Sequence, residues 1–385
     1  QDPSGSYEIV TNDERDQRTF VSLYVAPGFC KSMWQFTRRC VSVDGTHVST
    51  ILGGALLLLC SKDANNQNVL LAFAYVSKEN GAAYGFFFRR VASDFPGRVV
   101  AICDGDKGAA SQMSTEWRSA TLSRCFRHKI ENYQTSHPGH QIRRESILKL
   151  LYGLARATTD ELWDYLLEKL KKVDGEKTEA IAAWMESIKA EVNAMYFNNL
   201  GLSRFRDLLN NPCEQYNSAI LDLRVLPVVR MVRGLLQDIY KKGFQRREIG
   251  NRWLAEKKVF TEWAEEKLTL DLENSRNFSV RLREATERSF QADVTLNGES
   301  LITYKCEIRQ DDKGSAMMVC TCKQIWDTGR PCKHIVAAFR KAGDTAARRS
   351  WNLRDEKWFG HKSVYCVSEY VKQYSFPIPT IATGE

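Results

Sequence analysis

The order of apolar and turn-forming segments between Arg39 and Phe126 constrains the fold more than any other feature of this sequence. Short runs rich in strand-forming residues are broken by turn signals, and two segments with helical spacing lie between the later runs. Five strands and two helices are predicted, in the order strand, strand, strand, helix, strand, helix, strand, over 39–48, 54–61, 69–77, 82–95, 98–103, 107–117 and 121–126. This order favours an α/β fold, a mixed sheet covered by helices.

The rest of the chain is predicted to be mostly helical until its last quarter. Residues 141–199 have amphipathic helical periodicity and few strand signals, which predicts an all-helical block. A further helix is expected to open with Asn211 as N-cap and Pro212 in the first helical position, and Pro227 to end or kink it. More helix is expected over 259–289, and strands over 293–305 and 316–322 on either side of a turn at 311–314.

Composition describes a globular chain without a membrane span. Of the 385 residues, 43% are hydrophobic and 26% charged, which is typical of globular domains. The polar segment 1–20 does not resemble a signal peptide, and the longest apolar run, Ala55 to Cys60, is far shorter than the roughly 20 residues of a spanning helix. Eleven cysteines without a secretory signal favour a reducing compartment, with free thiols and metal ligands rather than disulfides.

Positive charge is concentrated in one stretch. Residues 224–258 hold ten Lys or Arg and three Asp or Glu, an excess of seven in a chain of net charge +8. Val228, Val232, Leu235 and Ile239 share one face of the predicted helix, whereas the opposite face carries Arg230, Arg233, Gln237 and Lys241. Such a face attracts polyanions, most often nucleic acid; alternatively it is an ordinary solvated helix face.

Three cysteines and one histidine have the spacing of a metal site. The sequence places Cys320 and Cys322 two residues apart, then nine residues, then Cys332 and His334. Residues two apart on a strand point to the same face, so Cys320 and Cys322 can reach one ion. Three thiolates and an imidazole suit a closed, tetrahedral structural zinc site. The alternative is four unrelated buried or surface residues.

Two aspartates are expected at the ends of predicted strands. Asp44 ends the first strand and Asp104 the fourth, and each is followed by glycine. If these strands are neighbours, both carboxylates project from the same edge of the sheet, where they can bind Mg²⁺. Taken singly, each is an ordinary Asp-Gly turn. Asp106 competes with Asp104 for the second position, and Asp104 is preferred because it follows the strand directly.

Several segments resemble a Mutator-like transposase domain. They are Val43-Asp44-Gly45-Thr46-His47, Gly53-Gly54, 63–67, 71–74, Asp104-Gly105-Asp106-Lys107-Gly108, Cys125-Phe126-Arg127-His128 and 211–218. The resemblance covers roughly residues 40–247, and the spacing at 320–338 is similar to a SWIM zinc finger. It implies an RNase H-like core interrupted by an all-helical insertion, with Asp44, Asp104 and Glu214 as a DDE triad. Without it, Glu214 reads as a capping-box residue bonded back to Asn211.

The resemblance also implies an activity and its partners. The triad would hold two Mg²⁺ or Mn²⁺ ions for cleavage and strand transfer of DNA in cut-and-paste transposition. Double-stranded DNA, as transposon ends and target, would be the partner of a nuclear homo-oligomer. DNA-binding residues would be Arg230, Arg233, Lys241, Lys242, Arg246 and Arg247, and Cys125 and His128 would be neighbours of the active site. A domesticated DNA-binding regulator and a zinc-finger protein-interaction module are the alternatives.

The expected organisation has seven parts. The parts are an N-terminal segment 1–38, the first part of the core 39–135, the helical insertion 136–210, the last part of the core 211–258, a linker region 259–305, the zinc finger 306–343 and a C-terminal tail 344–385.

Overall fold

The computed structural model describes most of the chain. The described residues are 4–14, 17–50, 52–104, 108–140, 142–173, 175–285, 289–296, 299–310, 316–343 and 366–375. Asp106 and the turn predicted at 311–314 lie outside them, as does most of the segment 344–385. None of the described helices is long and apolar enough to cross a bilayer.

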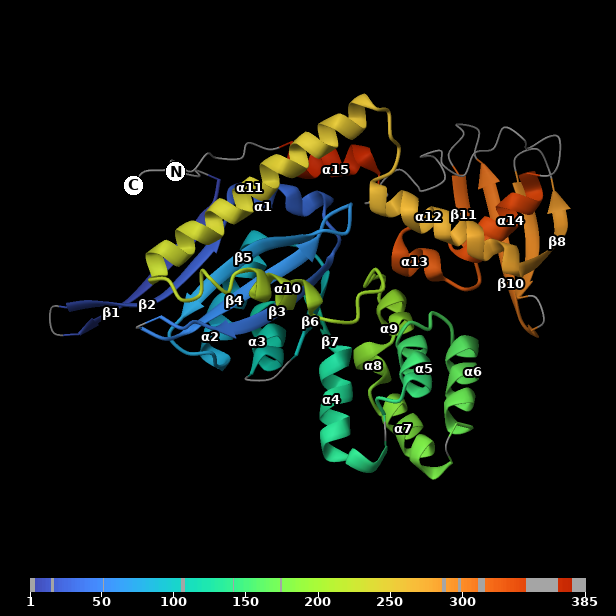
Figure 1. Cartoon of the computed structure of the whole chain (residues 1–385), viewed down its shortest axis with the longest axis horizontal. Helices are drawn as coiled ribbons and strands as arrows, with labels where there is room; N and C mark the ends of the chain where they lie inside the picture. Colours follow the sequence, from blue (N-terminus) through green and yellow to red (C-terminus); the bar gives the residue numbers. More distant parts are fainter. Residues whose placement is uncertain are drawn as a thin grey trace.

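A seven-stranded mixed sheet forms the first unit (Figure 1). Its spatial order is β1-β2-β5-β4-β3-β6-β7; β3, β6 and β7 run parallel, and the other neighbours are antiparallel. The strands are β1 (Ser6–Glu14), β2 (Gln17–Ala26), β3 (Cys40–His47), β4 (Ala55–Lys62), β5 (Asn68–Val76), β6 (Val99–Cys103) and β7 (Ala120–Arg124). The mixed sheet predicted for residues 39–126 is confirmed, and β1 and β2 extend it.

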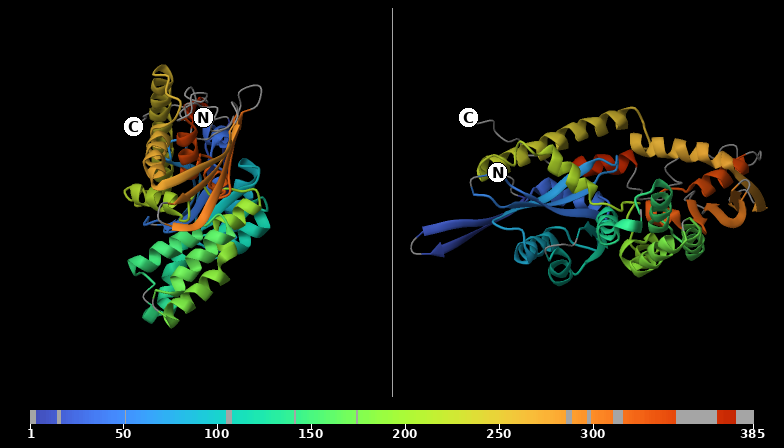
Figure 2. Two further views of the ribbon diagram at one scale, coloured as in Figure 1. Left: turned by 90° about the vertical axis from the view of Figure 1, so that its right-hand side faces the viewer. Right: turned by 60° about the horizontal axis from the view of Figure 1, so that its bottom comes forward.

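Helices cover the sheet, because its central strands are apolar on both faces. Every residue of β4 from Ala55 to Ser61 is buried, as is all of β6. One face carries α2 (Gly81–Asp94) and α3 (Ala109–Glu116); the other carries α1 (Gly28–Met33), α10 (Asn211–Ala219), α11 (Val228–Ala255) and α15 (Val367–Tyr374) (Figures 1 and 2). The 3₁₀ turn η1 (Trp34–Phe36) follows α1.

A helical block leaves the sheet after β7. It contains α4 (Phe126–Ser136), η2 (Pro138–His140), α5 (Glu145–Ala155), α6 (Asp160–Lys171), α7 (Glu176–Ser187), α8 (Lys189–Val192) and α9 (Ala194–Asn199). The helices expected over 141–199 are therefore present. Phe126 and Ile130 of α4 share a core with Leu151, Trp163 and Ile181. Residues 126–135, assigned to the sheet unit from the sequence, thus pack with the helical block.

The helices after this block differ in detail from the prediction. Asn210, not Asn211, is the N-cap of α10, with no side-chain capping bond, and Pro212 lies in the first turn. Pro227 neither ends nor kinks α10, which stops at Ala219; it is the N-cap of α11. The apolar face of α11 is buried as expected: Leu235 is inaccessible to solvent, and Val228 and Ile239 are nearly so.

The second sheet unit contains residues that were predicted to belong to two separate parts, the linker region and the zinc finger. The order β11-β10-β9-β8 is antiparallel throughout, with α12 (Glu262–Asn274), α13 (Gln324–Thr328) and α14 (Lys333–Gly343) beside it. The strands are β8 (Phe278–Ala285), β9 (Ser289–Leu296), β10 (Glu299–Gln310) and β11 (Ala316–Cys320), and η3 (Ser275–Asn277) follows α12. The boundary proposed between residues 305 and 306 falls inside β10.

Two predictions in this unit are wrong. Residues 278–285 form a strand rather than a helix, because Phe278, Val280 and Leu282 alternate with exposed polar residues. The single strand expected over 293–305 is a pair of antiparallel strands, β9 and β10. Asn297-Gly298, between them in the sequence, is a strong hairpin signal that the prediction passed over.

Candidate active site and metal centre

Parallel pairing of β3 with β6 brings the two predicted aspartates together. Ser42 is in register with Ile102, and Asp44 and Asp104 each lie two residues further along. Asp104 directly follows β6, as predicted. Asp44 does not end its strand, because β4 continues to pair with β3 as far as His47. Asp44 thus lies within β3, just beyond the point where its pairing with β6 stops.

Helix α10 places Glu214 over the same strands. Its first turn is held on the sheet by Cys213, whose thiol donates to the carbonyl of Ser42 (Sγ–O 3.1 Å). One cavity of about 270 Å³ is shared by all three predicted acids. It is lined by Val43, Asp44, Gly45, Glu79, Tyr84, Cys103, Asp104, Ala109, Arg127, His128 and Glu214. The carboxylate of Glu214 accepts from Arg127.

The cavity disfavours negative charge. Burial, and then the charge of Glu214, raise the pKa of Asp44 to about 7, although the backbone N–H of Gly45 and the charge of His128 oppose the shift. The Asn217 amide donates to Asp44 (Nδ2–Oδ2 3.0 Å). Carboxylates confined in this way are stabilised by a bound cation, and hard oxygen ligands suit Mg²⁺ or Mn²⁺.

Two cationic side chains also line the cavity. The Nδ1 atom of His128 lies 3.4 Å from Oδ1 of Asp104, and Arg127 forms an ion pair with Glu214. A hydrogen bond with Cys125, and then the charges of Cys125 and Asp104, raise the pKa of His128 to about 9, against burial and Arg127. Cys125 is buried and donates to Asn210 (Sγ–Oδ1 3.1 Å).

Three lining residues were missed from the sequence. Arg127 lies inside the Cys125–His128 motif, so the motif itself could have pointed to it. Glu79 reads as an ordinary turn residue after β5, and Tyr84 as one of the buried residues of α2; the Tyr84 hydroxyl donates to Glu79 (2.9 Å). For neither Glu79 nor Tyr84 does the position in the sequence distinguish a site residue from an ordinary structural one.

Comparison with known proteins gives a family for part of the chain. The fold is of the α/β class. Two aspartates on its sheet and a glutamate on a neighbouring helix form a candidate site for a divalent metal. Residues 40–132 match the family model of the MULE transposase domain, which identifies this part of the chain as such a domain. The matched residues include Asp44, Asp104, Cys125 and His128, and Glu214 lies beyond them. No curated protein matches the chain.

Four further side chains gather at one end of the second sheet. Cys320, Cys322, Cys332 and His334 are all buried, and one ligand atom of each lies within 4.8 Å of the others. Cys322 lies in a turn after β11 rather than on the strand, yet it still faces Cys320. Cys332 and His334 flank the first residue of α14. This Cys₃His cluster has the donor set of a closed zinc site.

The surroundings of the cluster fit a metal. Backbone N–H groups of Gln324 and Ile335 donate to the sulfurs of Cys322 and Cys332 (both 3.4 Å), which stabilises thiolates. The ring of Tyr304 stacks on His334 with centroids 3.7 Å apart and fixes its orientation. A fourth thiol, Cys306 on β10, donates to Cys320 (Sγ–Sγ 3.6 Å); it was not predicted as a member of the site.

The predicted basic helix divides into two parts. Arg230, Arg233 and Lys241 are exposed on α11. Lys242 forms an ion pair with Asp238 (2.7 Å). Arg246 is packed against Asp63, Tyr374 and the carbonyl of Asn68, and Arg247 donates to the carbonyl of Tyr374. Arg246 and Arg247 thus hold α15 on the sheet unit, and their role in DNA binding stays a prediction.

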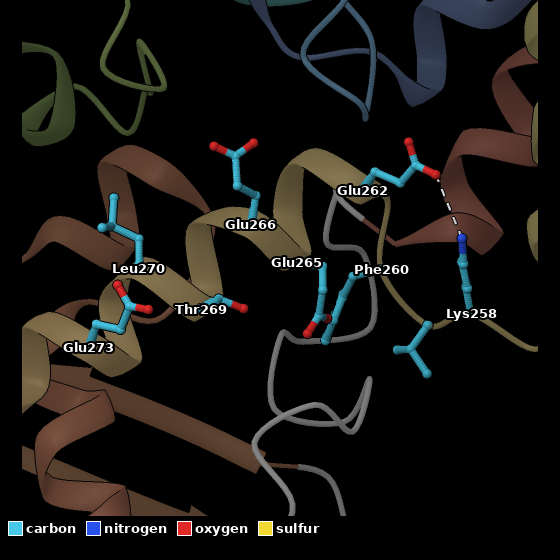
Figure 3. Close-up of a pocket in the computed structure, with 9 residues that line it drawn as sticks. Lys258, Phe260, Glu262, Glu265, Glu266, Thr269, Leu270 and Glu273 are labelled. Carbon is cyan, nitrogen blue, oxygen red and sulfur yellow. Dashed lines mark ion pairs between the residues drawn. The ribbon is translucent and has the colours of Figure 1, made fainter.

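A larger cavity, of about 650 Å³, lies along α12 (Figure 3). Glu262, Glu265, Glu266 and Glu273 are among the residues that line it, and of these Glu262 pairs with Lys258 (3.6 Å). Such a lining repels phosphate, and it holds none of the predicted site residues.

Proposed function

We propose that this chain is a metal-dependent DNA transposase with an RNase H-like core and a DDE triad. The observation that carries the proposal is the single cavity shared by Asp44, Asp104 and Glu214 within and beside a MULE transposase domain. The strand order β5-β4-β3-β6-β7 and the helical block between β7 and α10 support the RNase H-like interpretation.

Asp44, Asp104 and Glu214 would hold Mg²⁺ or Mn²⁺, which lowers the pKa of a bound water or hydroxyl and neutralises charge on the scissile phosphate. The two strands fix the aspartates relative to one another. Asn217 holds one carboxylate oxygen of Asp44, and His128 faces one oxygen of Asp104. These contacts fix the orientation of each aspartate. In-line phosphoryl transfer requires metal ligands that are oriented in this way.

The remaining parts would serve DNA binding and folding. The Cys₃His cluster is proposed as a SWIM-type zinc finger whose ion stabilises the second sheet unit. The exposed face Arg230, Arg233 and Lys241 would neutralise phosphates of double-stranded DNA rather than read bases. A homo-oligomer on DNA and a nuclear location complete the proposal.

Metal-dependent nicking of labelled supercoiled DNA tests the activity. The wild-type chain is expected to nick in Mg²⁺ or Mn²⁺. Asp44→Asn, Asp104→Asn and Glu214→Gln should each lower the rate by about 10³-fold or more, because each removes a charge on which metal binding depends. Glu248→Gln, an exposed acid on α11, is the matched control and should nick normally. Binding of DNA without nicking by the wild type would favour the domesticated regulator.

A further inference from the structure

One wall of the proposed catalytic cavity carries a second set of ligands. Cys125 precedes α4, His128 lies one turn further along that helix, and Glu214 reaches them from α10. One ligand atom of each lies within 4.8 Å of the other two. A thiol, an imidazole and a carboxylate form a donor set for Zn²⁺ rather than Mg²⁺, which prefers oxygen ligands and keeps its waters.

We propose that Cys125, His128 and Glu214 form a second zinc-binding site, distinct from the Cys₃His cluster, that shares Glu214 with the proposed catalytic triad. The geometry of the three residues carries the site itself. Its effect on catalysis rests on the proposed function.

A cationic group already occupies the space between two of these ligands. The Nη2 atom of Arg127 lies 3.4 Å from Nε2 of His128 and is bonded to Glu214. The Arg127 side chain is 40% exposed, and its Nε lies 3.6 Å from the carboxylate of Glu131. Arg127 can therefore move toward Glu131 when an ion takes its place. The guanidinium of Arg127 thus lies where a positive charge is stabilised by the carboxylate of Glu214.

The other ring nitrogen of His128 is placed to support a metal. Nδ1 is buried and has no hydrogen-bond acceptor in ideal geometry among the described residues, yet Oδ1 of Asp104 lies 3.4 Å away. A metal on Nε2 leaves the proton on Nδ1, directed at Asp104. Ligating histidines commonly donate to a carboxylate in this way, which fixes the ring and strengthens the ligand.

Zinc binding needs only a small contraction. Zn–S near 2.3 Å and Zn–N near 2.0 Å set ligand atoms about 3.5 Å apart, compared with separations of up to 4.8 Å here. Three protein ligands leave a fourth position for water. Glu214 would then be drawn toward Cys125 and away from Asp44, so zinc should inhibit the Mg²⁺-dependent reaction.

Zinc stoichiometry tests the site without relying on activity. The full chain is equilibrated with Zn²⁺, passed through a desalting column and analysed by plasma mass spectrometry. We expect two zinc ions per wild-type chain, one in Cys125→Ser and one in His128→Asn. Asp44→Asn is the matched control: it removes a proposed magnesium ligand from the same cavity and should keep two.

Cobalt absorption identifies the ligands. A second equivalent of Co²⁺ should add thiolate-to-cobalt charge-transfer absorption in the wild type that is missing in Cys125→Ser. One zinc per wild-type chain, or two retained in both variants, overturns the proposal. If Cys125→Ser also loses the zinc of the Cys₃His cluster, that variant has misfolded, and His128→Asn, altered at a partly exposed ring, gives the decision.

Nicking assays separate this proposal from the proposed function. If the wild-type chain binds two zinc ions but does not nick DNA in Mg²⁺, the second zinc site is supported and the transposase function is contradicted. If it binds one zinc ion and nicks DNA at a rate that micromolar Zn²⁺ does not slow, the transposase function is supported and the second zinc site is contradicted.

Discussion

At Asp44 the charged form is penalised when no cation is bound. Burial and the charge of Glu214 raise its pKa from 3.8 to about 7. The folded state therefore holds a proton that the unfolded state has released between about pH 4 and pH 7, so Asp44 lowers stability as pH rises through this window. The charge repulsion that favours a metal is thus a cost to the metal-free fold.

Asp44→Asn should accordingly stabilise the Mg²⁺-free protein. We expect a gain in the free energy of unfolding on the order of 2 kcal/mol at pH 8 and almost none at pH 4. The gain at pH 8 is smaller than the pKa shift at ~1.4 kcal/mol per unit would give, because the side chain is partly exposed to solvent. The amide keeps an oxygen for Asn217 to donate to. Urea unfolding at the two pH values measures the effect. A gain independent of pH would show that Asp44 ionises freely.

Sequence patterns located some site residues and not others, for a physical reason. Asp44 and Asp104 were predicted because residues at the carboxyl ends of neighbouring parallel strands lie at the same edge of the sheet. Glu214 needed the family resemblance, because periodicity cannot tell which helix returns to that edge. Arg127 and Glu79 have no periodic signature at all: their roles come from an ion pair and a hydrogen bond across the cavity.

At the scale of elements, strands with buried faces were predictable and exposed ones were not. The strands β4, β5 and β6 are apolar because they are covered on both faces. β1 was missed because it is an edge strand whose Tyr7 is 78% and Ile9 56% exposed, so burial imposes little pattern on it. The strand β8 alternates clearly, and the helical assignment there overlooked a period of two.

The exposed basic face of α11 gives a prediction for DNA binding. The triple variant Arg230→Ala, Arg233→Ala, Lys241→Ala should weaken binding about equally across sequences. It should also reduce the slope of log K against log salt by up to about three units, at roughly 0.9 per phosphate contact. Fluorescence anisotropy at several salt concentrations measures both. The matched control is Lys78→Ala, Arg89→Ala, Arg90→Ala, three exposed residues near or on α2; equal losses in both variants would remove any special role for α11.

Removal of the metal should unfold the second sheet unit alone. Cys332→Ser is expected to lose one zinc per chain and hydrogen-exchange protection over β8–β11 and α14, because structural zinc contributes directly to folding. β3–β6 should stay protected. Cys306→Ser is the control, since that thiol borders the cluster without belonging to it. Equal zinc loss in both variants would make Cys306 a ligand.

At the scale of the whole molecule, a buried polar contact joins the helical block to the second sheet unit. Asp327 on α13 accepts from the backbone N–H of Arg204 (3.3 Å), and both side chains are buried. Burial raises the pKa of Asp327, and the charge of Arg204 opposes this. Ser203 donates to the carbonyl of Asp327, and Thr158 to that of Cys322, so two further bonds cross the same interface.

Asp327→Ala should destabilise the chain by about 3 kcal/mol, because it leaves the buried Arg204 without the carboxylate whose charge favours its own charge most. Urea unfolding measures the loss, and Asp222→Ala, an exposed acid, should cost almost nothing. A loss below about 0.5 kcal/mol, the usual effect of a surface substitution, would mean that water reaches Arg204 when Asp327 is removed.

The position of α15 has a consequence for how the chain folds during synthesis. Val367, Tyr370 and Tyr374 complete the core of the first sheet, more than 300 residues after β1, and Tyr374 donates to Asp63. A ribosome releases the strands of that sheet first and the helix that seals them last. The second sheet unit, whose residues lie between, can therefore fold earlier than the unit that begins the chain. Nascent chains stalled before residue 367 should show a folded second sheet unit beside a first sheet unit still open to proteases.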